Sequence, residues 1–156
     1  MKTAFCAVTL ITPLLAGCAT PPDAQAPAEP AVAELTPHGA LDERIAYYAR
    51  VYDVPESLIR RSVQRESGYN PKRHAGPYWG LMQIRLDTAR GVGYRGTARG
   101  LLDADTNLKY AVAYLSNAYR VAGGNPDRAL ALYAAGYYYE ARRKGLLDQL
   151  RKAQDD

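Results

Sequence analysis

Glu66 is the residue of this chain whose position best suits acid–base chemistry. It lies near the end of a predicted helix over residues 54–70, in which Pro55 suits the first turn and Gly68 the position after the last turn. At 3.6 residues per turn, Glu66 falls on the arc of the apolar face, with Leu58, Ile59, Ser62 and Val63. Apolar neighbours and the negative end of the helix dipole both favour a protonated carboxyl group over a carboxylate. We therefore expect Glu66 to enter a cleft as a general acid, which must still hold its proton near neutral pH.

Two later segments become candidates for the same cleft through the family resemblance that is described below. Residues 80–84 read Gly-Leu-Met-Gln-Ile, and residues 131–136 read Ala-Leu-Tyr-Ala-Ala-Gly. Each feature has an ordinary structural explanation when taken alone. A glycine-hinged apolar run is most often core, a tyrosine on a helix face is often packing, and a glutamate near a helix end usually turns into water or pairs with an arginine. The joint occurrence of the three segments is what favours a functional site.

The remaining pattern predicts a mainly helical domain. Leu41, Ile45, Tyr48 and Tyr52 share one helical face, and so do Leu108, Val112, Leu115 and Tyr119. Asn125 followed by Pro126 predicts a helix start. We expect one helix over residues 81–89 and a long helix that is capped by Asp105 or Thr106 and ends at residue 121. Shorter helices are expected over residues 137–144 and 146–151. Loops are expected over residues 69–79 and 96–104. No segment shows a convincing strand alternation, although a small hairpin within residues 78–96 stays open.

The N-terminus predicts export and membrane attachment. Lys2 precedes a short apolar run that is too short for a stable membrane anchor, so residues 1–17 are expected to be a signal peptide. The run ends in Leu-Ala-Gly-Cys, which resembles the lipobox of bacterial lipoproteins and implies that Cys18 is lipidated; an ordinary cleaved signal with an incidental cysteine is the alternative. By resemblance to enteric lipoprotein sorting, Ala19 in place of Asp favours the outer membrane, which puts the domain in the periplasm. Residues 18–38 are rich in Ala and Pro and predict a flexible linker, and residues 39–156 form the domain.

Composition excludes several classes of function. The net charge of +4 comes from dispersed residues with no basic run and no nucleic-acid motif, so no nucleic-acid partner is expected. Both cysteines are N-terminal and the two histidines, His38 and His74, are isolated, so we expect no metal site and no cofactor. All thirteen tyrosines follow residue 46, where they suit a carbohydrate or peptide cleft or serve simply as core aromatics. We expect a monomer.

Taken together, the three segments resemble a known family. Residues 66–71 (Glu-Ser-Gly-Tyr-Asn-Pro), 80–84 and 131–136, in this order and spacing, are similar to the motifs of the soluble lytic transglycosylase family of murein-cleaving enzymes, relatives of goose-type lysozyme. The resemblance runs from about Leu41 to Gly145. It implies a lysozyme-like helical domain with a substrate cleft that binds peptidoglycan glycan strands.

The resemblance also implies roles for particular residues. Glu66 matches the single catalytic acid, and Ser67 matches the serine that positions the acid or the sugar. Met82 and Gln83 match residues that touch the substrate, and Tyr133 matches a tyrosine whose hydroxyl lies near the acid. This chain departs from the family in having Ala134 where an Asn is usual, and Tyr137-Tyr138 where Pro-Gly is usual. Stacking on the substrate could come instead from Trp79 and from residues 137–139.

The expected chemistry uses one acid. Ordinary glycosidases use two carboxylates, but Asp87, Asp103 and Asp105 lack an apolar setting like that of Glu66. The resemblance implies that Glu66 protonates the oxygen between N-acetylmuramic acid (MurNAc) and N-acetylglucosamine (GlcNAc), then removes the proton of the muramic 6-hydroxyl to give a 1,6-anhydro end. Two alternatives stay open. One is a hydrolytic muramidase, with water held by a polar group such as Asp103 or Tyr133, and the other is a murein-binding lipoprotein without catalysis.

Overall fold

The computed structural model describes residues 37–154, all of them within the unit Glu34–Asp156. The expected signal peptide, Cys18 and the linker up to residue 36 lie outside the described residues. The first helix begins at Pro37, slightly before the expected domain start at Gly39. No helix in the described range is long and apolar enough to span a bilayer.

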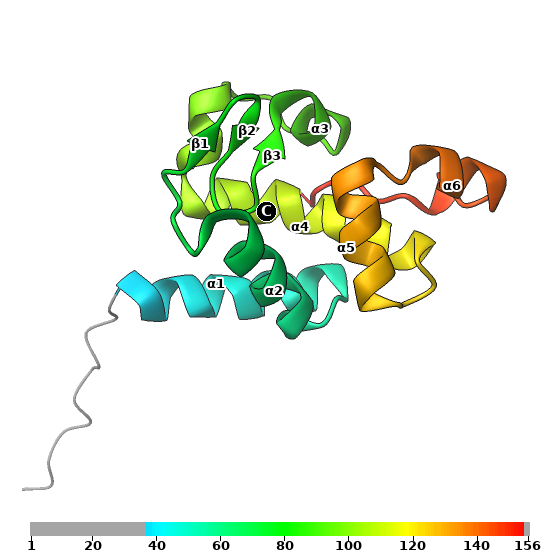
Figure 1. Cartoon of the computed structure of the whole chain (residues 1–156), viewed down its shortest axis with the longest axis horizontal. Coiled ribbons are helices and arrows are strands. Elements are labelled where there is room, and N and C mark those ends of the chain that lie inside the picture. Colours follow the sequence, from blue (N-terminus) through cyan, green and yellow to red (C-terminus); the bar gives the residue numbers. More distant parts are fainter. Residues whose placement is uncertain (1–36, 155–156) are drawn as a thin grey trace, which may run out of the picture. The chain divides into compact units, whose positions relative to one another are not determined.

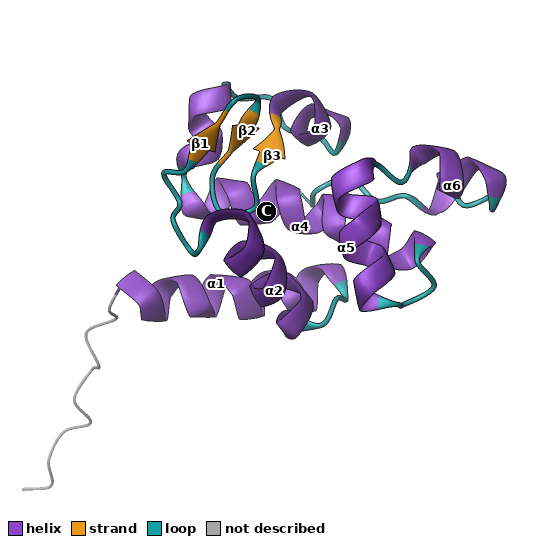
Figure 2. Cartoon of the chain, in the orientation of Figure 1, coloured by secondary structure: helices purple, strands orange, loops and turns teal. Residues whose placement is uncertain are grey.

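The described part is mainly helical, as expected, with one small sheet (Figures 1 and 2). In chain order the elements are α1 (Pro37–Tyr52), α2 (Glu56–Ser67), β1 (His74–Ala75), β2 (Tyr78–Trp79), β3 (Ile84–Arg85), α3 (Leu86–Gly91), the 3₁₀ helix η1 (Ala98–Leu102), α4 (Ala104–Val121), α5 (Pro126–Ala135), α6 (Tyr138–Arg143) and the 3₁₀ helix η2 (Leu147–Gln149).

Helix α4 forms the centre of the core. It packs against α1 on one side and α5 on another, and η1 and α3 also contact it (Figure 1). Most of the apolar faces predicted for α1 and α4 are buried: Ile45, Leu108, Val112 and Leu115 have no exposed surface, whereas Leu41 and Tyr119 are partly buried. Burial of whole Leu and Val side chains is worth about 1.5–3 kcal/mol each before entropic costs, so these faces account for the packing of the helical part.

Helix α2 is shorter than the predicted helix over residues 54–70, but Gly68 lies just past its last turn, as predicted. Pro55 is the N-cap residue, and Gly68 ends the helix in the left-handed conformation, with φ of 61° and ψ of 38°. The Gly68 N–H donates to the carbonyl of Gln64 at 3.1 Å, which satisfies one of the carbonyl groups that a helix end leaves free. The end of α2 is therefore fixed one turn beyond its last buried aliphatic residue, Val63.

The segment after α2 differs from the prediction. Residues 69–79, expected as a loop, and 81–89, expected as a helix, contain a three-stranded antiparallel sheet in the order β1-β2-β3, and the helix starts only at Leu86. Strands β2 and β3 form a hairpin within residues 78–96, where the sequence had left one open. His74 pairs with Trp79, and Tyr78 with Arg85. The helix cannot include Gly80 or Gln83, whose φ values of 74° and 47° an α-helix excludes. Ile84 and Arg85 are paired in β3, so the helix begins at Leu86.

Other elements begin or end a few residues from their predicted positions. The expected loop over 96–104 contains η1. The carboxylate of Asp103, and not Asp105 or Thr106, caps α4 by accepting the Thr106 N–H at 2.8 Å. Asn125 caps α5 by accepting the Arg128 N–H at 2.9 Å, as expected.

Candidate active site

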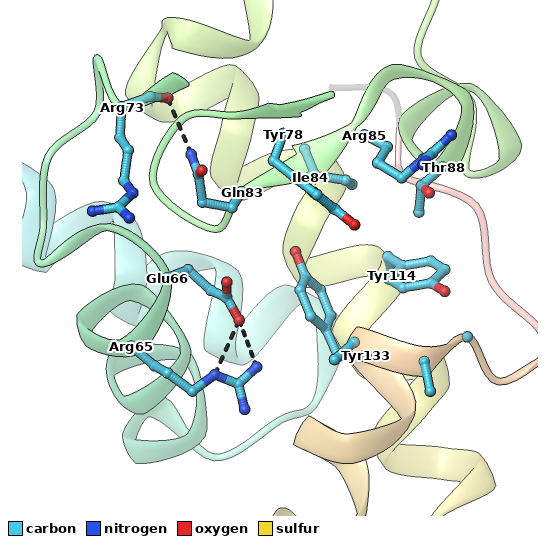
Figure 3. Close-up of a pocket in the computed structure, with 13 residues that line it drawn as sticks. Arg65, Glu66, Arg73, Tyr78, Gln83, Ile84, Arg85, Thr88, Tyr114 and Tyr133 are labelled. Atoms are coloured by element: carbon cyan, nitrogen blue, oxygen red, sulfur yellow. Dashed lines mark hydrogen bonds and ion pairs between the residues drawn. The ribbon is translucent and has the colours of Figure 1, made fainter. Parts of the chain in front are cut away.

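A pocket of about 470 Å³ lies where the end of α2, the sheet and the C-terminal half of α5 meet (Figure 3). Helix α2 supplies Arg65 and Glu66, the sheet region supplies Arg73, Tyr78 and Gln83, and α5 supplies Tyr133. The pocket therefore brings together the three segments that the sequence singled out, although they lie far apart in the chain.

Glu66 projects from the end of α2 into this pocket, and 24% of its side chain is exposed. Its Oε1 accepts hydrogen bonds from Nε and Nη2 of Arg65, at 3.0 and 2.5 Å (Figure 3). Glu66 thus pairs with an arginine, which is the ordinary arrangement of a glutamate near a helix end, and the wholly apolar setting that was expected is not found. The other oxygen, Oε2, accepts no hydrogen bond from any residue between 37 and 154, so it is available to a ligand.

Tyr133 lies beside Glu66 with its ring buried. Its hydroxyl donates to the backbone carbonyl of Met82 at 2.8 Å, and its ring meets that of Tyr114 edge to face, with centroids 5.4 Å apart. Burial raises the pKa of Tyr133 well above 10, and the negative charge of Glu66 adds to this shift. Tyr133 is therefore a neutral wall of the pocket that ties α5 to the Met82 turn.

Gln83 is positioned by the backbone of its own turn. Its Nε2 donates to the carbonyls of Gly80 and Arg73, at 2.9 and 3.1 Å. Its φ of 47° is unusual for a residue with a Cβ and is found where the surroundings compensate for the strain. Because both amide hydrogens are used, Oε1 of Gln83 remains as an acceptor on the pocket wall.

Asn107, which the sequence reasoning missed, supports this turn from α4. It is fully buried. Its Oδ1 accepts the Met82 N–H at 2.9 Å, and its Nδ2 donates to the carbonyls of Trp79 and Leu101, both at 2.8 Å. A Cβ at Gly80 would stand 2.2 Å from this Nδ2, so the glycine is required for the close approach. An Asn next to Leu108, at the edge of the inward face of α4, was the available signal, because buried amides need partners.

Three other expected site residues lie outside this pocket. The side chain of Met82 is fully buried in the core, so it contributes through its carbonyl and its N–H and does not itself reach a substrate. Ser67 is buried, and its hydroxyl donates to the Val63 carbonyl at 3.2 Å. Tyr137 lines an adjoining pocket, where it accepts the Asn117 amide at 3.1 Å, and burial raises the pKa of Tyr137 to about 12. The ring of Trp79 stacks on His74, with centroids 3.7 Å apart.

Glu66 is the only carboxylate that lines the pocket within the described part of the chain. The nearby aspartates have structural partners. Asp87 pairs with Arg85 at 2.7 Å, which lowers its pKa to about 2, while Asp103 caps α4 and Asp105 pairs with Arg44. Among residues 37–154 no three His, Cys, Asp or Glu side chains lie together as a metal site would require. The geometry therefore offers one acid, the phenols of Tyr78, Tyr114 and Tyr133, and the amide oxygen of Gln83 as an acceptor.

The mainly helical domain with its small sheet is consistent with a lysozyme-like fold. Residues 43–154 match the Transglycosylase SLT domain family, and the chain belongs to this family. Over 105 residues, or 62% of this chain, it is 32% identical to the soluble lytic murein transglycosylase of Salmonella typhimurium. It spans 16% of that relative's length. No solved structure matches the chain.

Proposed function

We propose that this protein is a peptidoglycan lytic transglycosylase. It cleaves the β-1,4 bond between MurNAc and GlcNAc and leaves 1,6-anhydro-MurNAc ends. Membership of the SLT family supports a role in peptidoglycan cleavage. The observation that carries the proposal is that Glu66 is the one lining carboxylate of the described pocket and has one oxygen free of partners.

In the first step, Glu66 donates a proton from Oε2 to the glycosidic oxygen, and the bond from that oxygen to the muramic anomeric carbon breaks. Positive charge develops at the anomeric carbon and is shared by the oxygen of the sugar's own N-acetyl group. Arg65 holds Oε1 during this step, so Oε2 is directed toward the pocket. An acid positioned in this way typically contributes about 10²–10⁴-fold to the rate.

In the second step, the Glu66 carboxylate takes the proton of the 6-hydroxyl on the same sugar. The 6-oxygen then bonds to the anomeric carbon, which closes the 1,6-anhydro ring and restores the acid. No water enters the products, so the pocket must exclude it from the anomeric carbon. Tyr133 and Gln83 contribute as walls, the first apolar and neutral, the second with an acceptor oxygen for sugar hydroxyls.

The remaining expected residues have supporting roles in this proposal. Ser67 ties the last turn of α2 to Val63 and so positions Glu66. Tyr137 is 7% exposed, so it contributes only the accessible edge of its ring to the neighbouring part of the groove, as an apolar surface beside a sugar. Met82 acts through its backbone, which links Tyr133 and Asn107.

The test is the variant Glu66→Gln assayed on purified sacculi, with Glu56→Gln on the same helix as its matched control. Glu56 pairs with Arg60 and lines neither pocket. We expect Glu66→Gln to lose about 10²–10⁴-fold of the cleavage rate and Glu56→Gln to keep it, with both variants folded by circular dichroism. Full activity in a folded Glu66→Gln protein would remove Glu66 as the acid.

Mass spectrometry of the products separates the alternatives. Anhydro ends, lighter by one water, support the transglycosylase. Reducing ends would assign a hydrolytic muramidase instead. Binding to sacculi without any released product would assign a binding lipoprotein.

We also propose that Cys18 is lipidated and attaches the protein to the periplasmic side of the outer membrane. The support is the Leu-Ala-Gly-Cys sequence after the apolar run. Cys18→Ser should abolish incorporation of labelled palmitate and release the protein from the membrane fraction. Unchanged labelling would refute lipidation at this residue.

A further inference from the structure

The candidate active pocket continues into a second pocket of about 360 Å³. The two share Thr88, Tyr114 and Gly136, so they are parts of one groove. In Figure 3, Arg73 lies on one side of Glu66 and Tyr133, whereas Thr88 and Tyr114 lie on the other. Arg73 therefore marks one end of the groove, and the second pocket, which Arg151 and Lys152 line, marks the other.

The lining of this groove is strongly cationic. Five of its described residues carry a positive charge (Arg65, Arg73, Arg85, Arg151 and Lys152) and one, Glu66, carries a carboxyl group. Arg65 and Arg85 already pair with Glu66 and Asp87. The side chains of Arg73, Arg151 and Lys152 make no ion pair with any residue of the described range. A neutral glycan backbone would not require these three charges.

The backbone that carries the free cations is held in place at both ends of the groove. The Arg73 carbonyl accepts two hydrogen bonds, from the Gly80 N–H at 2.8 Å and from Gln83 Nε2 at 3.1 Å. The Arg151 N–H donates to Oδ1 of Asn117 and its carbonyl accepts from Nδ2, both at 2.8 Å. Asn117 is only 1% exposed. Buried amides thus fix the main chain beneath the charges while the charged groups themselves stay available to a ligand.

We propose that Arg73, Arg151 and Lys152 bind carboxylates on the side groups of the glycan, so that the groove selects charged murein over an uncharged polymer. This inference rests on the proposed function for the identity of the glycan. Each MurNAc residue bears a lactyl group, which either keeps its free carboxylate or is joined by an amide bond to a stem peptide with carboxylates of its own. Guanidinium and ammonium groups form their strongest hydrogen bonds with such anions.

Binding measured without turnover tests the proposal. The variants Arg73→Gln and Arg151→Gln/Lys152→Gln are made in the Glu66→Gln background, with Arg99→Gln as control, because Arg99 is exposed and lines neither pocket. Co-sedimentation is measured with peptide-bearing strands, with strands stripped of peptide by an amidase, and with uncharged poly-N-acetylglucosamine. We expect the ratio of charged to uncharged binding to fall about fivefold in each test variant and to stay unchanged in Arg99→Gln.

The comparison of peptide-bearing with stripped strands identifies which carboxylate is bound. A fall confined to peptide-bearing strands assigns the stem peptides, and a fall confined to stripped strands assigns the free lactyl group. The proposal would be overturned if the test variants kept their melting temperature and gave the same ratio of charged to uncharged binding as the Arg99→Gln protein, with both charged polymers. Because the readout is binding, it stays informative even if Glu66 proves not to be the acid.

Discussion

The two sides of the candidate pocket are built in different ways. On the helical side, α2 positions Glu66 by packing, because Leu58, Ile59 and Val63 are buried against the core. On the sheet side, each of the three strands is only two residues long. Such strands form too few ladder bonds to be stable alone.

Side-chain amides supply hydrogen bonds that the short strands cannot form with one another. Asn107 bonds three backbone groups of the sheet side and η1, and Gln83 bonds two more. Both residues are buried, where a hydrogen bond is stronger and a missing one costs more. The position of Glu66 therefore depends on apolar packing, whereas the conformation of the turn that faces the pocket depends on the hydrogen bonds of two side-chain amides.

Asn107→Leu should have the largest effect on stability. Leucine has the same number and branching of side-chain heavy atoms, although it is bulkier, and it leaves the Met82 N–H and the carbonyls of Trp79 and Leu101 buried without their partner. At about 1–3 kcal/mol for each group, we expect a loss of about 4 kcal/mol in the free energy of unfolding. Urea denaturation measures it, and hydrogen exchange should show the greatest acceleration at Met82. A loss below that of a surface variant such as Tyr139→Ala would contradict the role given to Asn107.

Leu115→Ala tests the helical side. Leu115 is fully buried in α4, so the truncation leaves a cavity and should cost about 3 kcal/mol. Here we expect hydrogen exchange to accelerate broadly over α1, α4 and α5, without a maximum at the sheet. A response concentrated at residues 74–85 would show that the two sides are not held separately.

Replacing Tyr137 should have a smaller effect on the free energy of unfolding, and this effect should depend on pH. Burial raises its pKa to about 12 from the ordinary 10, so the folded protein keeps this proton more tightly than the unfolded chain. The corresponding stability is fully present below pH 10 and is lost as the pH rises from 10 to about 12. Tyr137→Phe should flatten this part of the stability profile, while Tyr139→Phe, at a site 81% exposed, should not. Parallel profiles for the two variants would rule out the proposed contribution.

The sequence predicted the helical side well because its signals are local. Pro55 and Gly68 delimit α2, Asn125 with Pro126 begins α5, and the spacing of aliphatic residues identifies the buried faces of α1 and α4. It predicted the sheet side poorly. Two-residue strands are too short for an alternating pattern. The positive φ of Gln83 occurs in a turn held by hydrogen bonds from Gln83 to the Arg73 carbonyl and from the Met82 N–H to Asn107, which join segments that no local rule connects.

The amino-acid sequence by itself determined the end of α2, the start of α5 and the apolar faces of α1 and α4, because helix caps and periodicity act over a few residues. The resemblance of three short segments to the motifs of a family made Glu66, Gln83 and Tyr133 candidates for one site. Only the tertiary structure decided that Arg65 holds one oxygen of Glu66, that Met82 serves through its backbone, and that free cations stand at both ends of the groove. These features join segments far apart in the chain, and long-range packing and buried hydrogen bonds bring them together.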